Sequence, residues 1–76
     1  MKKIGSNMYE EMIGSKKVLF SYTTPVAYYD YADSCFYKTE KRWSSTTSRH
    51  ISKFYSMTSG VIEVKPQEFF DRLVSK

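Results

Sequence analysis

The sequence contains few of the residues that usually form cross-links, metal sites or phosphate-binding loops. It has one cysteine (Cys35), one histidine (His50) and three glycines (Gly5, Gly14 and Gly60). A single cysteine excludes an intramolecular disulfide and with it the disulfide-rich secreted mini-proteins, so a reducing cytoplasm is the expected compartment. One histidine and one cysteine are too few for a structural zinc site, and no glycine-rich phosphate loop is present. We therefore expect no metal and no cofactor.

Long apolar runs are also missing. No run approaches the ~20 residues of a transmembrane helix, and the basic start of the chain has no apolar stretch behind it. We expect neither membrane insertion nor a signal peptide. There is no repeat and no linker, and 76 residues suffice for one domain at most. Residues 1–76 are therefore predicted to form a single small domain.

Aromatic side chains, by contrast, are abundant. The chain has seven Tyr, five Phe and one Trp, and 41% of its residues are hydrophobic. This content is too high for a disordered tail, and tyrosine suits half-exposed sheet faces and binding surfaces alike. The net charge of +4 favours encounter with nucleic acid or acidic proteins, although many inert small domains carry as much.

Alternation of apolar and polar residues predicts several strands. Pro25 interrupts the first of them, and because proline cannot donate to a sheet ladder we expect a bulge, an edge or a turn there. A turn is expected at residues 30–33, where Asp30 and Asp33 can bond the local backbone. The strands predicted in this way cover residues 17–23, 26–31, 34–39 and 61–64.

Residues 8–13 allow two interpretations. Asn7 with Glu10 resembles a capping box, and Gly14 could end a short helix. Alternatively, Gly14 and Ser15 form the turn of a hairpin that joins residues 8–13 to the next strand. We prefer the hairpin because a helix of about six residues gains little stability by itself.

Two short helices complete the prediction. The first covers residues 46–55, with Ser45 or Thr46 as its N-cap. The second begins at Pro66, a residue that suits the first helical position. Trp43 is expected to anchor the junction before the first helix, and the core candidates on the helices are Ile51, Phe54, Phe69, Phe70 and Leu73.

These elements predict an α+β fold. A small antiparallel sheet of three to four strands is packed with two short helices in two layers. At most one face of such a sheet is covered by the helices, so some tyrosine rings should remain exposed.

Residues 43–54 form the most site-like stretch. A hydroxyl-rich run, residues 44–48, precedes the first helix, whose exposed N–H groups attract anions. The same run can instead cap the helix and bond neighbouring turns. Lys38 and Lys41 lie close in sequence to this stretch and add to its positive charge. In a nucleic-acid complex, tyrosines on the predicted strands could stack on bases while these basic side chains hold phosphates. The binding residues expected are Arg42, Thr46, Thr47, Ser48, Arg49, His50, Lys53, Tyr29 and Tyr37.

Catalysis is not expected. The sequence has no nucleophile elbow, and Cys35 falls in a predicted strand without a catalytic context. A lone histidine such as His50, beside an apolar helix face, is more often a packed residue that bonds a backbone carbonyl. We therefore expect a protein that is not an enzyme.

Three segments carry a resemblance to a known group of proteins: residues 21–27 (SYTTPVA), 43–51 (WSSTTSRHI) and 64–70 (VKPQEFF). They resemble small uncharacterised proteins of tailed bacteriophages and prophages, which have a Tyr-x-Thr-Pro-Val-Ala strand followed by an aromatic-Ser-x-Thr-Thr-Ser-x-His helix start. The resemblance covers residues 17–74 and leaves out the stretch before Lys16. It implies an accessory phage protein in the cytoplasm of a host bacterium, and it supplies no catalytic residue.

Two functions fit these features. The first is a non-enzymatic accessory protein that modulates a host or antiviral-defence protein through an aromatic and basic surface. The alternative is a module that binds DNA or RNA through a basic stripe on the first helix (Arg49 and Lys53), Arg42 and the sheet tyrosines. The chain is expected to be a monomer or a small homo-oligomer paired through an exposed sheet edge.

Overall fold

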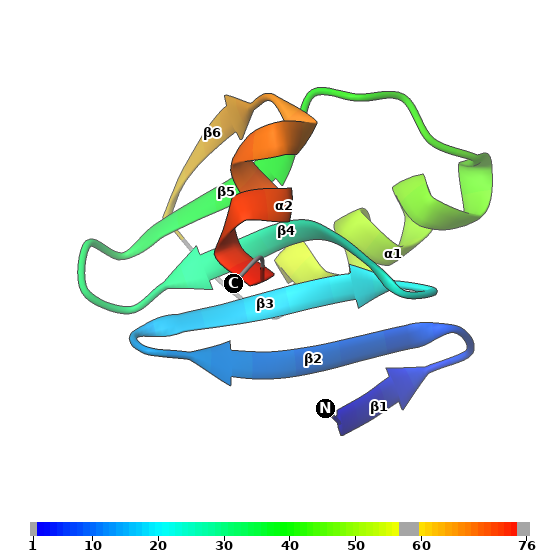
Figure 1. Ribbon diagram of the computed structural model, residues 1–76, viewed down its shortest axis with the longest axis horizontal. Helices are drawn as coiled ribbons and strands as arrows, with labels where there is room; N and C mark the ends of the chain where they lie inside the picture. The colour runs from blue at the N-terminus through cyan, green and yellow to red at the C-terminus, as the bar shows by residue number, and fades with distance from the viewer. Residues whose placement is uncertain (1, 57–59, 75–76) are drawn as a thin grey trace.

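The computed structural model describes residues 2–56 and 60–74 (Figure 1). Within these residues, six strands form one sheet in the order β1-β2-β3-β4-β5-β6. Neighbouring strands are antiparallel except β5 and β6, which are parallel and are separated in sequence by α1. The elements are β1 (Lys2–Gly5), β2 (Met8–Ile13), β3 (Lys16–Ser21), β4 (Thr24–Asp30), β5 (Cys35–Thr39), α1 (Ser45–Ser56), β6 (Val61–Lys65) and α2 (Gln67–Val74).

The predicted antiparallel sheet of three to four strands is wrong. The sheet is larger because Lys2–Gly5 adds a strand that the sequence did not suggest, and it is mixed because α1 carries the chain back to the same end of the sheet. The hairpin interpretation of residues 8–13 is confirmed, since Met8–Ile13 pairs with Lys16–Ser21 across a turn with Gly14 at φ 62°.

The helices cover opposite faces of the sheet, so the prediction of two layers with one covered face is also wrong. In Figure 1, α2 lies in front of the sheet and α1 behind it. The central strands are apolar on both sides, and each side needs its own cover. The cluster beneath α1 contains Met8, Leu19, Val26, Ala27, Phe36 and Phe54. The cluster beneath α2 contains Val18, Phe20, Tyr28 and Phe70.

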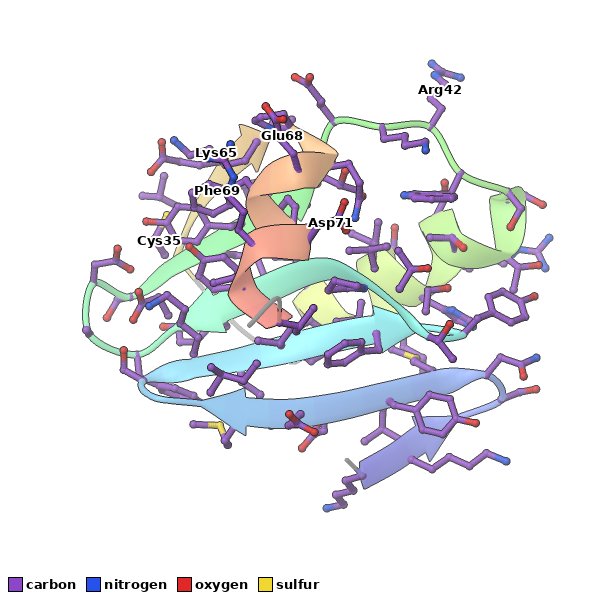
Figure 2. The ribbon with its side chains drawn as sticks, in the orientation of Figure 1. Cys35, Arg42, Lys65, Glu68, Phe69 and Asp71 are labelled. Carbon is purple, nitrogen blue, oxygen red and sulfur yellow. The ribbon has the colours of Figure 1, made fainter. Side chains whose placement is uncertain are left out.

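The helices supply the core residues that their spacing predicts. Phe54 and Phe70 are fully buried, whereas Ile51, Phe69 and Leu73 pack half-buried around the two clusters. Figure 2 shows Phe69 on α2 with Lys65 beside it. Each helix therefore buries one large phenylalanine and surrounds it with partly exposed apolar side chains.

A bulge at Pro25 is confirmed. The β3–β4 register shifts between Leu19 and Phe20, so that Val26 is the extra residue. As a result, Val26 and Ala27 both belong to the cluster beneath α1, although they are consecutive. The bulge therefore thickens the core where α1 crosses the sheet.

The turn at residues 30–33 is confirmed as well. Asp30 Oδ1 accepts a hydrogen bond from the Ala32 N–H at 2.9 Å, and Asp33 Oδ1 accepts one from the Cys35 N–H at 3.1 Å. Both carboxylates bond the backbone two residues ahead, as expected of Asp in turns.

Candidate anion-binding groove

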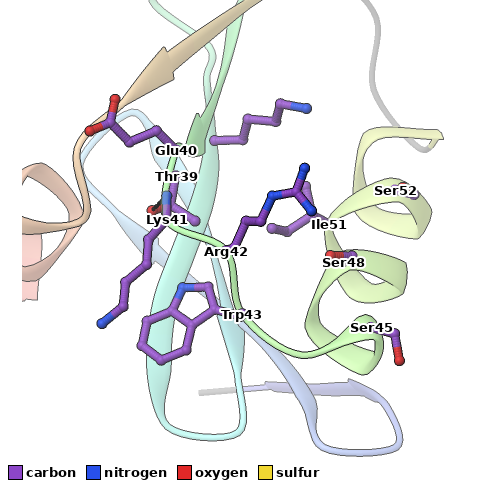
Figure 3. A pocket seen from close by; sticks show the side chains of 10 residues that line it. Thr39, Glu40, Lys41, Arg42, Trp43, Ser45, Ser48, Ile51 and Ser52 are labelled. Atoms are coloured by element: carbon purple, nitrogen blue, oxygen red, sulfur yellow. Dashed lines mark hydrogen bonds between the residues drawn. The ribbon is translucent and has the colours of Figure 1, made fainter.

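A groove lies between helix α1 and the loop that joins it to β5 (Figure 3). Its volume is about 560 Å³. Figure 3 shows Arg42 extending from the loop toward α1, while Glu40 points away. The groove is lined by Lys38, Thr39, Glu40, Lys41, Arg42, Trp43, Ser45, Ser48, Ile51 and Ser52.

Hydrogen bonds donated by backbone N–H groups hold the loop at both of its ends. The Lys41 N–H donates to the buried Thr39 hydroxyl at 3.1 Å, and the Glu40 N–H donates to the Lys65 carbonyl at 2.8 Å. At the far end, the Thr47 N–H donates to Ser44 Oγ at 3.4 Å. The loop is therefore fixed in the geometry that carries its basic side chains, which lowers the entropic cost of binding a ligand.

Trp43 forms the wall of the groove and connects three parts of the fold. Its Nε1–H donates to Gln67 Oε1 at 3.2 Å, and Gln67 Nε2 donates to the Pro25 carbonyl of β4 at 2.8 Å. The indole also packs against the cluster beneath α1. Lys41 Nζ lies 4.2 Å from the centre of the indole ring, in cation–π contact. The expected anchoring role of Trp43 is confirmed.

The groove lining carries three cations and one carboxylate, Glu40, so its net charge is positive. Lys38, Lys41 and Arg42 line it, and none of them forms an ion pair within residues 2–56 and 60–74. Elsewhere on the sheet, lysines do pair with acids, namely Lys16 with Asp30, Lys17 with Glu10, and Lys65 with Glu63. Three unpaired cations beside three serine hydroxyls can hold an anion by charge-assisted hydrogen bonds.

The structure divides the predicted helix stripe. Ser48 faces the groove together with Ser45 and Ser52, because spacings of three and four residues return to one side of a helix. Arg49 and Lys53 are exposed but do not line the groove. Lys53 Nζ instead lies beside β1.

The helix start is occupied by its own side chains. Ser44 is the N-cap, so the predicted caps Ser45 and Thr46 were placed one and two residues too late. Thr46 is half-buried outside the groove. Thr47 is buried, and its hydroxyl bonds Ser21 Oγ at 2.9 Å. Thr46 therefore lies in the first turn of α1 outside the groove, and Thr47 belongs to the core.

His50 is packed, as expected, but its partner is a side chain and not a backbone carbonyl. Its Nδ1 lies 2.8 Å from Ser21 Oγ, which also bonds Thr47. Ser21 is only 2% exposed, so a substrate has no path to its hydroxyl. Next to it, Tyr22 has φ 61°, and its N–H donates to the Asn7 carbonyl at 2.7 Å. The network joins β3 to α1.

The predicted tyrosines lie on opposite faces of the sheet. Tyr29 packs half-buried on the α1 side, against Tyr31. Tyr37 is on the α2 side, stacked on Tyr28 with ring centres 4.5 Å apart and also contacting Phe69. Neither tyrosine reaches the groove. The tyrosines therefore do not form one platform with the basic residues.

Two tyrosines and the cysteine are held in their protonated forms. The Tyr37 hydroxyl donates to Asp33 Oδ2 at 2.7 Å, and this bond together with burial raises the pKa of Tyr37 well above its usual value. Burial, reinforced by the charge of Asp30, raises the pKa of Tyr28 to about 12. Burial likewise raises the pKa of the Cys35 thiol. A buried thiol of raised pKa is a poor nucleophile.

Sequence reasoning missed part of the groove. It did not assign Ser52 or Ile51 to a binding site, and it gave no role to Gln67. The serine spacing 45, 48 and 52 was a usable signal, since these positions share a helix side. No sequence signal indicated Gln67, because its contacts come from β4 and from the loop before α1.

Among the described residues, no group of three or more His, Cys, Asp or Glu side chains could hold a metal ion. Neither α1 nor α2 is long and apolar enough to cross a membrane.

Comparison with known proteins gives a family for the chain. Residues 2–72 match a family of unknown function (DUF8033), and the chain belongs to this family. The match includes the N-terminal stretch that the phage resemblance left out. No curated protein and no solved structure matches the chain.

Proposed function

We propose that this DUF8033 protein is a non-enzymatic binding module that holds an acidic segment of another protein in the groove. The observation that carries the proposal is that Lys38 of β5 and Lys41 and Arg42 of the anchored loop line one groove without an ion-pair partner among the described residues. The resemblance of residues 17–74 to small phage and prophage proteins supports an accessory phage role, and the partner we propose is a host or antiviral-defence protein in the bacterial cytoplasm.

An acidic protein segment suits the groove better than DNA or RNA does. A single-stranded nucleic acid needs aromatic rings on which bases can stack. Tyr37 already stacks on Tyr28, and Lys41 lies over Trp43. The rest of the lining consists of Lys38, Arg42, Thr39, three serines, Ile51, and Glu40, whose side chain points away from α1. Carboxylates with an apolar neighbour match that lining, through ion pairs and a small apolar contact.

The absence of catalysis is part of the proposal. Ser21 and His50 are the only described serine–histidine pair joined by a hydrogen bond, and both side chains are buried. The Cys35 thiol is buried as well, with a raised pKa. Catalysis by either group needs a substrate to reach it. Binding in the open groove needs no such access.

The proposal is tested by affinity capture from bacterial lysate with two double variants of matched chemistry. Lys38→Glu with Arg42→Glu reverses two charges in the groove. Arg49→Glu with Lys53→Glu reverses one arginine and one lysine on the exposed side of α1. We expect a discrete, nuclease-resistant protein to be retained by the wild type and by the second variant, and to be lost with the first.

Other results would redirect or reject the proposal. Recovery of nucleic acid that disappears on nuclease treatment or at raised salt favours the nucleic-acid function, because phosphate contacts are strongly salt-dependent. Equal loss of binding in both double variants shows that net charge matters and the groove does not. Circular dichroism of both variants confirms that they are folded.

A further inference from the structure

The two edges of the sheet differ in how they are protected. The β1 edge carries the exposed Lys2 and Lys3, and its pairing with β2 is irregular between Lys3 and Gly5. Charged side chains and irregular pairing prevent an edge strand from pairing with another chain. The β6 edge also carries charges, Glu63 and Lys65, but they are of opposite sign and its pairing with β5 is regular. Its apolar residues Val61, Ile62 and Val64 are 67%, 41% and 51% exposed.

The backbone of β6 is available for pairing at alternate residues. The Lys65 carbonyl accepts the Glu40 N–H, so Lys65 directs its backbone groups toward β5. Because alternate residues of a strand direct their backbone groups to opposite sides, Ile62 and Val64 present theirs to the outside. An added strand would find hydrogen-bond donors and acceptors there, next to exposed apolar side chains.

We propose that β6 pairs in an antiparallel manner with β6 of a second copy of this chain, centred on Val64. In this register, Val64 exchanges both backbone hydrogen bonds with Val64 of the second copy. Glu63 then stands directly opposite Lys65 of the second copy, and Lys65 opposite its Glu63. Ile62 then lies opposite Pro66 of the second copy, which has no N–H, so the pairing is limited at both ends and Val64 makes the main backbone contact.

The opposite charges of Glu63 and Lys65 indicate that the strand added to the β6 edge is β6 of a second copy of this chain. Glu63 and Lys65 already approach each other within one strand, at 3.9 Å, with side chains 49% and 36% exposed. Lys65 also contacts Phe69, 5.8 Å from its ring centre (Figure 2). Two copies in this register place two such pairs across the interface. The register centred on Glu63 instead places two carboxylates face to face, which is unfavourable.

The test measures self-association by sedimentation equilibrium in four samples. We expect the wild type to form dimers. Glu63→Lys places lysine opposite Lys65, and Lys65→Glu places glutamate opposite Glu63, so each variant alone should dimerise about tenfold more weakly. An equimolar mixture of the two should recover wild-type association, because each pair across the heterodimer is again of opposite charge.

The control is Lys3→Glu, which makes the same charge change as Lys65→Glu on the other edge of the sheet. It should leave dimerisation unchanged. A wild type that stays monomeric at millimolar concentration overturns the proposal, as does a mixture that associates no better than its components. Recovery in the mixture also requires both variants to be folded, so a folding defect cannot imitate the expected result.

Discussion

Ser21 connects β3 to helix α1 through two side-chain hydrogen bonds. Its Oγ lies 2.9 Å from Thr47 Oγ1 and 2.8 Å from His50 Nδ1, and all three side chains are buried. A buried polar group is stable only when it is paired, and one serine hydroxyl here pairs two groups. The cost of removing it is therefore larger than that of one average hydrogen bond.

Ser21→Ala should lower the free energy of unfolding by about 2–3 kcal/mol. The change leaves the Thr47 hydroxyl and His50 Nδ1 buried without this partner. Urea unfolding of the variant measures the loss. Ser52→Ala is the control, since Ser52 is exposed in the groove and its removal should cost less than about 0.5 kcal/mol. If Ser21→Ala lost no more stability than Ser52→Ala, the hydrogen bonds of Ser21 would not stabilise the packing of β3 against α1.

Asp30 makes the stability of the fold depend on acid pH. Its carboxylate accepts the Ala32 N–H and the Ser15 hydroxyl, both at 2.9 Å, and Lys16 Nζ lies 3.8 Å away. These contacts outweigh the cost of burial and lower the pKa of Asp30 below its ordinary value, the Ala32 bond contributing most. A carboxyl whose pKa is lower in the folded chain stabilises the fold above its unfolded-state pKa of about 3.9.

Asp30→Asn should therefore destabilise the protein at neutral pH and much less in acid. The wild type loses this stabilisation as pH falls through the pKa of Asp30, whereas the uncharged amide has none to lose. Urea unfolding of both proteins at about pH 7 and about pH 3 checks this. A difference in stability that is the same at both pH values would show that the charge of Asp30 has no effect.

At the scale of elements, the start of α1 determines where the loop before it ends. Ser44 Oγ accepts the Thr47 N–H, and the Ser44 carbonyl accepts the first helical hydrogen bond, from Ser48. Arg42 and Trp43 directly precede this cap, so the cap also fixes the last turn of the groove loop.

Ser44→Ala should cost about 1 kcal/mol of stability, whereas Ser45→Ala should have little effect. Among the described side chains, only that of Ser44 accepts a hydrogen bond from an N–H group of the first turn. Thermal unfolding of the two variants side by side distinguishes them. If Ser45→Ala lost as much stability as Ser44→Ala or more, Ser45 would be the cap, one of the two residues that the sequence alone suggested.

Several elements could be predicted because their signals are local. The alternation in residues 17–39 and the spacing of Ile51 and Phe54 each lie within one segment. Lys2–Gly5 could not be identified in this way, since its four residues include only one large apolar side chain, Ile4. It becomes a strand because Met8–Ile13 offers it an edge to pair with.

At the scale of the whole molecule, register decides which side chains meet. The predicted Tyr29 and Tyr37 would share a surface if they were paired across β4 and β5. The register instead pairs Tyr28 with Tyr37 and Tyr29 with Phe36, which places Tyr29 on the opposite face. A shift of one residue would reverse this outcome, and the sequence pattern does not determine it because both tyrosines fit either face.

The basic part of the site could be predicted more fully than its aromatic part. Lys38, Lys41 and Arg42 lie within five consecutive residues and stay together in the fold. Arg49 and Lys53 seemed to extend the same patch, but α1 turns them away from the loop. Which side of α1 faces the loop depends on how the opposite side of the helix packs on the sheet, here through Phe54.

The most direct measurement uses Trp43, which is the single tryptophan of the chain and lines the groove. Its fluorescence is followed while polyglutamate is added to the wild type, to Arg42→Glu and to Arg49→Glu. We predict a saturable change for the wild type and for Arg49→Glu, and binding roughly tenfold weaker for Arg42→Glu. No change in emission, or an equal loss of affinity in the two variants, would contradict an acidic ligand in this groove.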